Sequence, residues 1–143
     1  PPPPPPPRRD FFLLIRRPPI CTPLYSSAGS DVYKCQLRKW DGHPIRINSC
    51  FRNEATNRAI GGSKSSAHRY GLGMDLDSLG KKTNAELFKW MEKNLKFDQL
   101  IWEFGTEENP AWIHVGICED EKKYRNQKLT ATKSRSKTRY SFR

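Results

Sequence analysis

Two histidines and one aspartate are the residues whose types and spacing favour metal chemistry in this chain. They are His68, Asp75 and His114, from the segments SAHRYGLGMD and WIH. His68 and Asp75 lie too far apart for one helical turn, but Gly71 and Gly73 between them let the backbone fold back and bring both side chains to one point. Two imidazoles and one carboxylate are a catalytic type of zinc set, because the fourth coordination position stays open for water. The sequence therefore predicts a catalytic site with one zinc ion per chain.

Two short strands are expected to position these ligands. Residues 73–77 alternate between apolar and acidic side chains, which predicts a strand that directs Asp75 away from the core. Residues 111–118 form the last predicted strand, in which the apolar neighbours of His114 face the core. His114 is then expected to face the opposite side, where an active-site groove would lie.

The other elements predict an α+β domain. The clearest helix covers residues 84–95, where apolar side chains recur at helical spacing and Thr83 with Glu86 offers a capping box. Further strands are predicted over 44–52 and 97–104 and a short helix over 53–60, while residues 31–40 fit either a helix or a strand. This order favours a small antiparallel sheet with helices packed on one side.

The composition favours anionic binding partners but does not identify one. The 143 residues carry a net charge of +11, which attracts polyanions such as nucleic acid, anionic lipid or bacterial wall polymers. No apolar run is long enough to span a membrane, and the run at residues 11–15 is too short for a secretory signal, so we expect neither. The four cysteines form no C-x-x-C pair, and Cys50 and Cys118 are expected to be buried thiols, which fits synthesis in a reducing cytoplasm.

Three segments are predicted along the chain. Residues 1–22 are rich in proline and arginine and are expected to be disordered or loosely attached. Residues 23–120 would form the folded zinc domain. Residues 121–143 are dense in lysine and arginine and are expected to be a basic tail that cannot fold alone, but can bind nucleic acid or wall polymer without sequence preference.

The site residues also carry a family resemblance. The pattern S-x-H-x-x-G-x-(A/G)-x-D, followed about forty residues later by W-I-H-V, resembles the D-alanyl-D-alanine carboxypeptidase family of zinc peptidases, which includes phage endolysins. Lysostaphin-type endopeptidases and the hedgehog signalling domain are distant relatives in fold. Upstream, residues 49–52 with the trailing Asn57 resemble the family's S-G-Y-R block, and residues 98–103 resemble the stretch before its final histidine.

The resemblance implies roles for particular residues. It implies that His68, Asp75 and His114 bind zinc, and that Arg52 contacts carbonyl or carboxylate oxygens of the substrate. A guanidinium suits that task because it offers a fixed, permanently charged fork of donors. Three further residues are expected to support the metal loop or contact the substrate: Ser49, Ser66 and Trp112.

One position departs from the family pattern. Several relatives place a glutamate or aspartate three residues before the last histidine as the general base, whereas this chain has Ala111. Glu103, at the end of the preceding predicted strand, is our candidate for the base. Glu107 and Glu108, in the following turn, are weaker candidates.

By resemblance, the expected activity is zinc-dependent cleavage of peptidoglycan stem peptides. The bond remains open, since both D,D-carboxypeptidase and endopeptidase action fit. A monomer of phage-lysin type would be made in the bacterial host cytoplasm and act on the cell wall. The alternatives are a zinc-binding module without catalysis, which Ala111 supports, and a basic nucleic-acid-binding protein, which leaves the histidines and aspartate unexplained.

Overall fold

A computed structural model describes residues 28–118, 120–135 and 137–143, so the predicted proline- and arginine-rich segment 1–22 lies outside the described residues. The helices and strands follow one another in this order: α1 (Ala28–Asp41), β1 (Ile45–Ser49), α2 (Glu54–Ala59), the 3₁₀ helix η2 (Ala67–Tyr70), β2 (Gly73–Ser78), α3 (Asn84–Asn94), β3 (Gln99–Glu103), β4 (Trp112–Gly116), the 3₁₀ helix η3 (Glu121–Lys123), β5 (Gln127–Ser134) and β6 (Lys137–Phe142). Residues 31–40, which fit either a helix or a strand, therefore belong to a helix.

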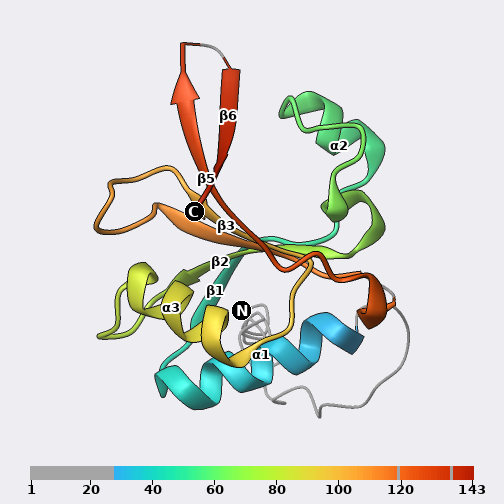
Figure 1. Cartoon of the computed structure of the whole chain (residues 1–143). Coiled ribbons are helices and arrows are strands. Elements are labelled where there is room, and N and C mark those ends of the chain that lie inside the picture. Colours follow the sequence, from blue (N-terminus) through green and yellow to red (C-terminus); the bar gives the residue numbers. More distant parts are fainter. Residues whose placement is uncertain (1–27, 119, 136) are drawn as a thin grey trace, which may run out of the picture.

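The strands form one six-stranded sheet in the order β1-β2-β4-β3-β5-β6. Every neighbouring pair is antiparallel except β3 and β5, which run parallel. The predicted α+β class with a mainly antiparallel sheet is confirmed. Helices α1 and α3 cover one face of this sheet, whereas α2 lies beyond the opposite face (Figure 1), so the prediction of helices on one side holds for the two longer helices.

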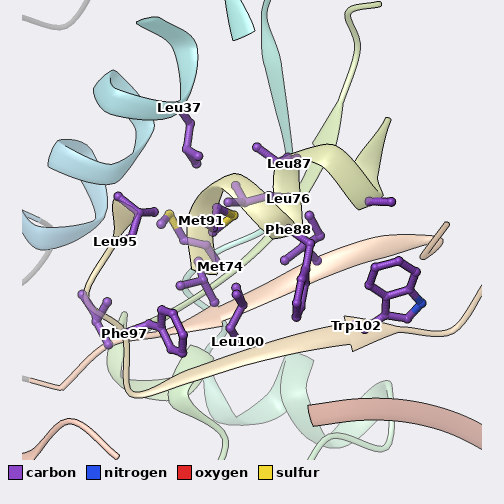
Figure 2. Packing of buried hydrophobic residues seen from close by; sticks show 14 residues of the cluster. Leu37, Met74, Leu76, Leu87, Phe88, Met91, Leu95, Phe97, Leu100 and Trp102 are labelled. Atoms are coloured by element: carbon purple, nitrogen blue, oxygen red, sulfur yellow. The ribbon is translucent and has the colours of Figure 1, made fainter. Parts of the chain in front are cut away.

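The core lies between the sheet and helices α1 and α3. Helix α3 begins at the predicted capping box, in which the Thr83 side chain accepts a hydrogen bond from the Glu86 backbone and the Glu86 side chain accepts one from the Thr83 backbone. Figure 2 shows the apolar side chains that meet there. Those with at most 2 % exposure on α1, α3 and the sheet are Leu37, Met74, Leu76, Leu87, Phe88, Met91, Leu100, Trp102, Ile113 and Val115. The alternate residues of β2 and β4 therefore face away from this core.

The C-terminal residues differ from the predicted basic tail. Residues 127–134 form β5, which hydrogen-bonds to β3, and residues 137–142 form β6, which pairs with β5. Leu129 and Ala131 pack against Ile101 in a second, smaller apolar cluster. The segment has too few apolar residues to fold alone, but it folds as an extension of a sheet whose edge strand already offers unpaired backbone groups. The hairpin is therefore part of the domain.

Cysteine chemistry also differs in part from the expectation of reduced thiols. Cys50 and Cys118 are free thiols, as predicted, but they are half-buried and not buried. Cys35, in contrast, is disulfide-bonded. Among the described residues, no helix has the length and apolar character required to cross a bilayer.

The docking of β5 predicts the effect of one substitution. Leu129 is only 9 % exposed, so Leu129→Ala should lower the free energy of unfolding by about 2 kcal/mol through lost burial and the cavity that remains. Leu79→Ala is the matched control, because Leu79 is 52 % exposed and its truncation should change stability by less than about 0.5 kcal/mol. Urea unfolding of both variants measures the difference. An equal loss of unfolding free energy in both variants would mean that residues 127–134 behave as a solvated tail.

Candidate metal centre

Three side chains from separate elements converge on one point beside the sheet. The Nε2 atom of His68 lies 3.1 Å from Oδ1 of Asp75 and 3.1 Å from Nδ1 of His114, and the latter two atoms are 2.9 Å apart. His68 comes from η2, Asp75 from β2 and His114 from β4. The structure therefore brings together the three residues that the sequence analysis selected as metal ligands.

The size of this triangle fits a zinc ion. Zinc binds nitrogen and oxygen ligands at about 2.0–2.1 Å, so two ligand atoms of a tetrahedral site are separated by about 3.3 Å. The three observed separations are within a few tenths of an ångström of that value. Three protein ligands leave the fourth tetrahedral position free, as in catalytic zinc sites.

The tautomer of His68 is set by a backbone carbonyl. Its Nδ1–H donates to the oxygen of Cys50 at 2.7 Å. In the neutral imidazole this leaves Nε2 as an acceptor that faces the other two ligands. A carbonyl that accepts from the second nitrogen is the usual way in which a protein orients a metal-binding histidine. The backbone N–H of Arg52 in turn donates to the His68 carbonyl at 3.0 Å, which closes the loop against the end of β1.

Two glycines allow the chain to pass between the ligands. Gly71 ends η2 with a φ of 70°, in the left-handed region that favours glycine. At Gly73 a Cβ atom would lie 3.0 Å from Cε1 of His114 and 3.1 Å from the His68 backbone nitrogen. A side chain at this position would therefore push apart two of the three ligands.

The strand register places further groups on the ligand face. Asp75 pairs with His114, and His114 pairs with Ile101, so these side chains share the face opposite the main core. Two residues along β3, Glu103 pairs with Trp112. Glu103 is thus a diagonal neighbour of His114, at roughly 7–8 Å between backbone positions. Glu103 was the predicted base, and it lies on the face that a base must occupy.

Asp75 is an ionised carboxylate in this environment. Burial alone would raise its pKa, but the hydrogen bonds and charges of His114 and His68 outweigh burial and hold the pKa of Asp75 well below its usual range. Arg52 adds an ion pair, with its Nη2 atom 3.2 Å from Oδ2 of Asp75. One carboxylate oxygen thus faces the histidines, while the other anchors the guanidinium beside the site.

The pKa of Glu103 is shifted in the opposite direction, upward. Its side chain is 9 % exposed. Burial, followed by the negative charge of Asp75, raises the pKa of Glu103 to about 7, against a smaller lowering by Arg52. A carboxyl group with a pKa near neutrality can both take up and release a proton at physiological pH.

The other predicted site residues lie around the ligands or in the β3–β4 loop. Ser49 pairs with Asp75 at the end of β1, and the Trp112 ring packs edge-on against Phe104. Ser66 precedes η2 and makes no side-chain capping bond there, although its carbonyl accepts from the Arg69 backbone. Ser66 thus orders the loop through its backbone. Glu107 and Glu108, the weaker candidates for the base, are exposed in the β3–β4 loop.

Two groups that hold the site were not among the predicted site residues. One is the Cys50 carbonyl, which no side-chain pattern reveals. The other is Asn84, whose amide donates to Asp77 and to the carbonyls of Pro110 and Ala111. Asn84 thus connects the start of α3 to the turn that leads into β4. An asparagine in the first turn of a helix is common, so the sequence carries no specific signal for this role.

The triangle predicts zinc binding that depends on each ligand. Wild-type protein should bind about one zinc per chain, and His68→Ala should weaken binding by more than about 100-fold, because even the loss of a group that orients a ligand costs 10- to 100-fold. His43→Ala is the matched control, since the His43 ring hydrogen-bonds to the Asp41 carbonyl and is not part of the ligand triangle. Calorimetric titration with zinc measures both. Equal affinity of the two variants would exclude this site.

A comparison with known families agrees with the geometry. A family model described as Peptidase M15 matches residues 29–116, which is more than half of the chain. The matched range contains the three ligand residues, Arg52 and Glu103, and ends before β5. No curated protein matches the chain.

Proposed function

Because the chain belongs to the Peptidase M15 family of zinc-dependent metallopeptidases, we propose that it hydrolyses a peptide bond in peptidoglycan stem peptides, with zinc held by His68, Asp75 and His114. The observation that carries this proposal is the placement of a buried carboxyl of near-neutral pKa, Glu103, on the same sheet face as a zinc-sized triangle of ligands. A structural zinc site needs no such neighbour.

Each part of the site has a separate task. When bound, zinc polarises a carbonyl as a Lewis acid and lowers the pKa of water to about 7. Glu103 accepts a proton from the attacking water and returns it to the departing nitrogen of the peptide bond, which needs a pKa near the working pH. His68 and His114 would bind zinc through their ring nitrogens, and the Cys50 carbonyl accepts a hydrogen bond from Nδ1 of His68, which directs Nε2 toward the metal.

Arg52 binds the substrate in this proposal. Its guanidinium is anchored by Asp75, and 16 % of its side chain remains exposed at the site. A fixed, charged donor of this kind can hold a carbonyl or carboxylate oxygen of the peptide and stabilise negative charge that develops during the reaction. Ser49 pairs with Asp75 from β1, and Trp112 lies two residues before His114 on β4.

The peptidoglycan substrate rests on the family resemblance and the surface charge. A net charge of +11 favours an anionic partner such as the bacterial wall. Action as a D,D-carboxypeptidase and action as an endopeptidase both fit the site. Synthesis in a bacterial host cytoplasm and a phage-lysin role belong to the same proposal.

Digestion of purified peptidoglycan tests the function. Zinc-loaded wild type should release new amino groups, and mass spectrometry of the muropeptides identifies the bond that is cut. Glu103→Gln should lower kcat by about 100- to 10,000-fold, the usual contribution of a positioned general base, with zinc binding retained. Glu107→Gln is the matched control and should retain activity, because Glu107 is exposed in the loop.

Two results would contradict parts of this proposal. Zinc binding by a wild type that cleaves no muropeptide would leave a zinc-binding module without catalysis. Full activity in Glu103→Gln would remove Glu103 as the base but keep the metal site.

The pH dependence should follow the ionisation of Glu103. Only the carboxylate can accept a proton, so kcat/KM should rise with pH through the apparent pKa of this group. That pKa is about 7 without metal, and a bound cation lowers it, so the midpoint should lie between about 4.5 and 7. Measurement of kcat/KM from about pH 5 to pH 9 gives the midpoint. A rate that stays flat or increases toward acid pH would contradict the assignment.

A further inference from the structure

One row of side chains crosses four strands on the ligand face. Trp112 on β4 pairs with Glu103 on β3, Glu103 pairs with Ala131 on β5, and Ala131 pairs with Tyr140 on β6. Side chains at paired positions point to the same face of a sheet. Tyr140 therefore projects from the same face as Glu103 and the zinc ligands, although it is distant from them in sequence.

Ala131 places only a small side chain between Glu103 and Tyr140. Two strand spacings separate Glu103 from Tyr140, about 10 Å between backbone positions. The residue between them has only a methyl group and is fully buried. No large side chain on β5 therefore stands in this row, and a tyrosine can lean across it toward the carboxyl group.

The surroundings of the Tyr140 hydroxyl disfavour its ionisation. Burial, then the negative charges of Glu103 and Asp75, raise the pKa of Tyr140. The phenol consequently keeps its proton at neutral pH and acts as a hydrogen-bond donor. More than half of the residue, 57 %, is still exposed, so a substrate can reach it.

The sheet order puts Tyr140 and Arg52 on opposite sides of the ligands. Arg52 follows β1 at one edge of the sheet, and Tyr140 is on β6 at the other edge. Figure 1 shows the β5–β6 hairpin extending beyond the same face as α2. A peptide lying across this face would meet a donor on each side of the reacting bond.

We propose that Tyr140 is a substrate-contacting residue whose hydroxyl donates a hydrogen bond to the reacting carbonyl oxygen from the hairpin side of the groove. The inference rests on the proposed function, since it assigns a role within that reaction. It goes beyond the family match, which ends at residue 116. The C-terminal hairpin thus supplies part of the active site and does more than extend the sheet.

Removal of the hydroxyl alone tests this role. Tyr140→Phe should lower kcat/KM by about 10- to 100-fold, the cost of losing one hydrogen bond to a developing charge, mainly through kcat. Zinc affinity and melting temperature should not change, because the ring and the strand remain. Tyr124→Phe is the matched control: it removes a phenol that packs against the main core and should leave kcat/KM unchanged.

A second measurement does not depend on turnover. A phosphinate analogue of the cleaved dipeptide, or of D-alanyl-D-alanine where no cleavage is detected, carries a tetrahedral anion in place of the scissile carbonyl. Calorimetric titration of the zinc-loaded protein should show binding about 10- to 100-fold weaker in Tyr140→Phe than in wild type.

The outcomes separate the two proposals. Cleavage by wild type with unchanged kcat/KM and unchanged phosphinate affinity in Tyr140→Phe overturns the role of Tyr140 and keeps the proposed function. Phosphinate binding that weakens in Tyr140→Phe, in a protein that cleaves nothing, keeps the contact and overturns the hydrolase. Neither cleavage nor phosphinate binding by wild type overturns both.

Discussion

Three potential ligand atoms held within 3.1 Å of one another impose the main electrostatic constraint on this domain. The Cys50 carbonyl accepts a hydrogen bond from Nδ1 of His68, so in the neutral imidazole Nε2 presents a lone pair to an ionised carboxylate and a second imidazole. Lone pairs and negative charge at such separations repel unless a proton or a metal cation lies between them. The glycines of the metal loop, the β2–β4 register and the Arg52 ion pair all maintain this arrangement.

In the proposed function, the general base comes from a different strand than the family resemblance predicts. The family pattern puts a carboxylate three residues before the last histidine, where this chain has Ala111. The Ala111 backbone N–H donates to the Glu103 carbonyl at 3.0 Å, so the two positions are neighbours across a strand pair. Glu103 thus places a carboxyl group beside Ala111, the position at which the family pattern has one. Because burial raises its pKa to about 7, the replacement also has suitable acid–base properties.

Local patterns predicted the two strands that carry Asp75 and His114 and the main helix, but not the 3₁₀ helix that carries His68. The alternation in residues 73–77 gave the correct face for Asp75, and the capping box at Thr83 gave the correct start of α3. The alternation and the capping box each depend only on residues that are close in the sequence. The convergence of the three ligands followed from residue type and family resemblance, since no local pattern encodes a distance between strands.

The missed features depend on pairing between distant segments. Residues 127–142 carry many charges and few apolar groups, so their composition predicts a tail, yet β3 offers an edge on which they form strands. Parallel pairing of β5 with β3 sets the position of Tyr140 opposite Ala131, and nothing in the sequence around Tyr140 indicates that register. The contact of His68 with the Cys50 carbonyl was equally hidden, because any residue at position 50 supplies that oxygen.

X-ray absorption spectroscopy at the zinc edge of the purified, zinc-loaded protein tests the central claim most directly. The structure predicts nitrogen and oxygen neighbours alone at about 2.0–2.1 Å, with the outer-shell scattering of two imidazole rings. Sulfur scattering at about 2.3 Å would instead place the ion at a cysteine such as Cys50 or Cys118. That result, or scattering without imidazole rings, would contradict the assignment of His68, Asp75 and His114 as the metal centre.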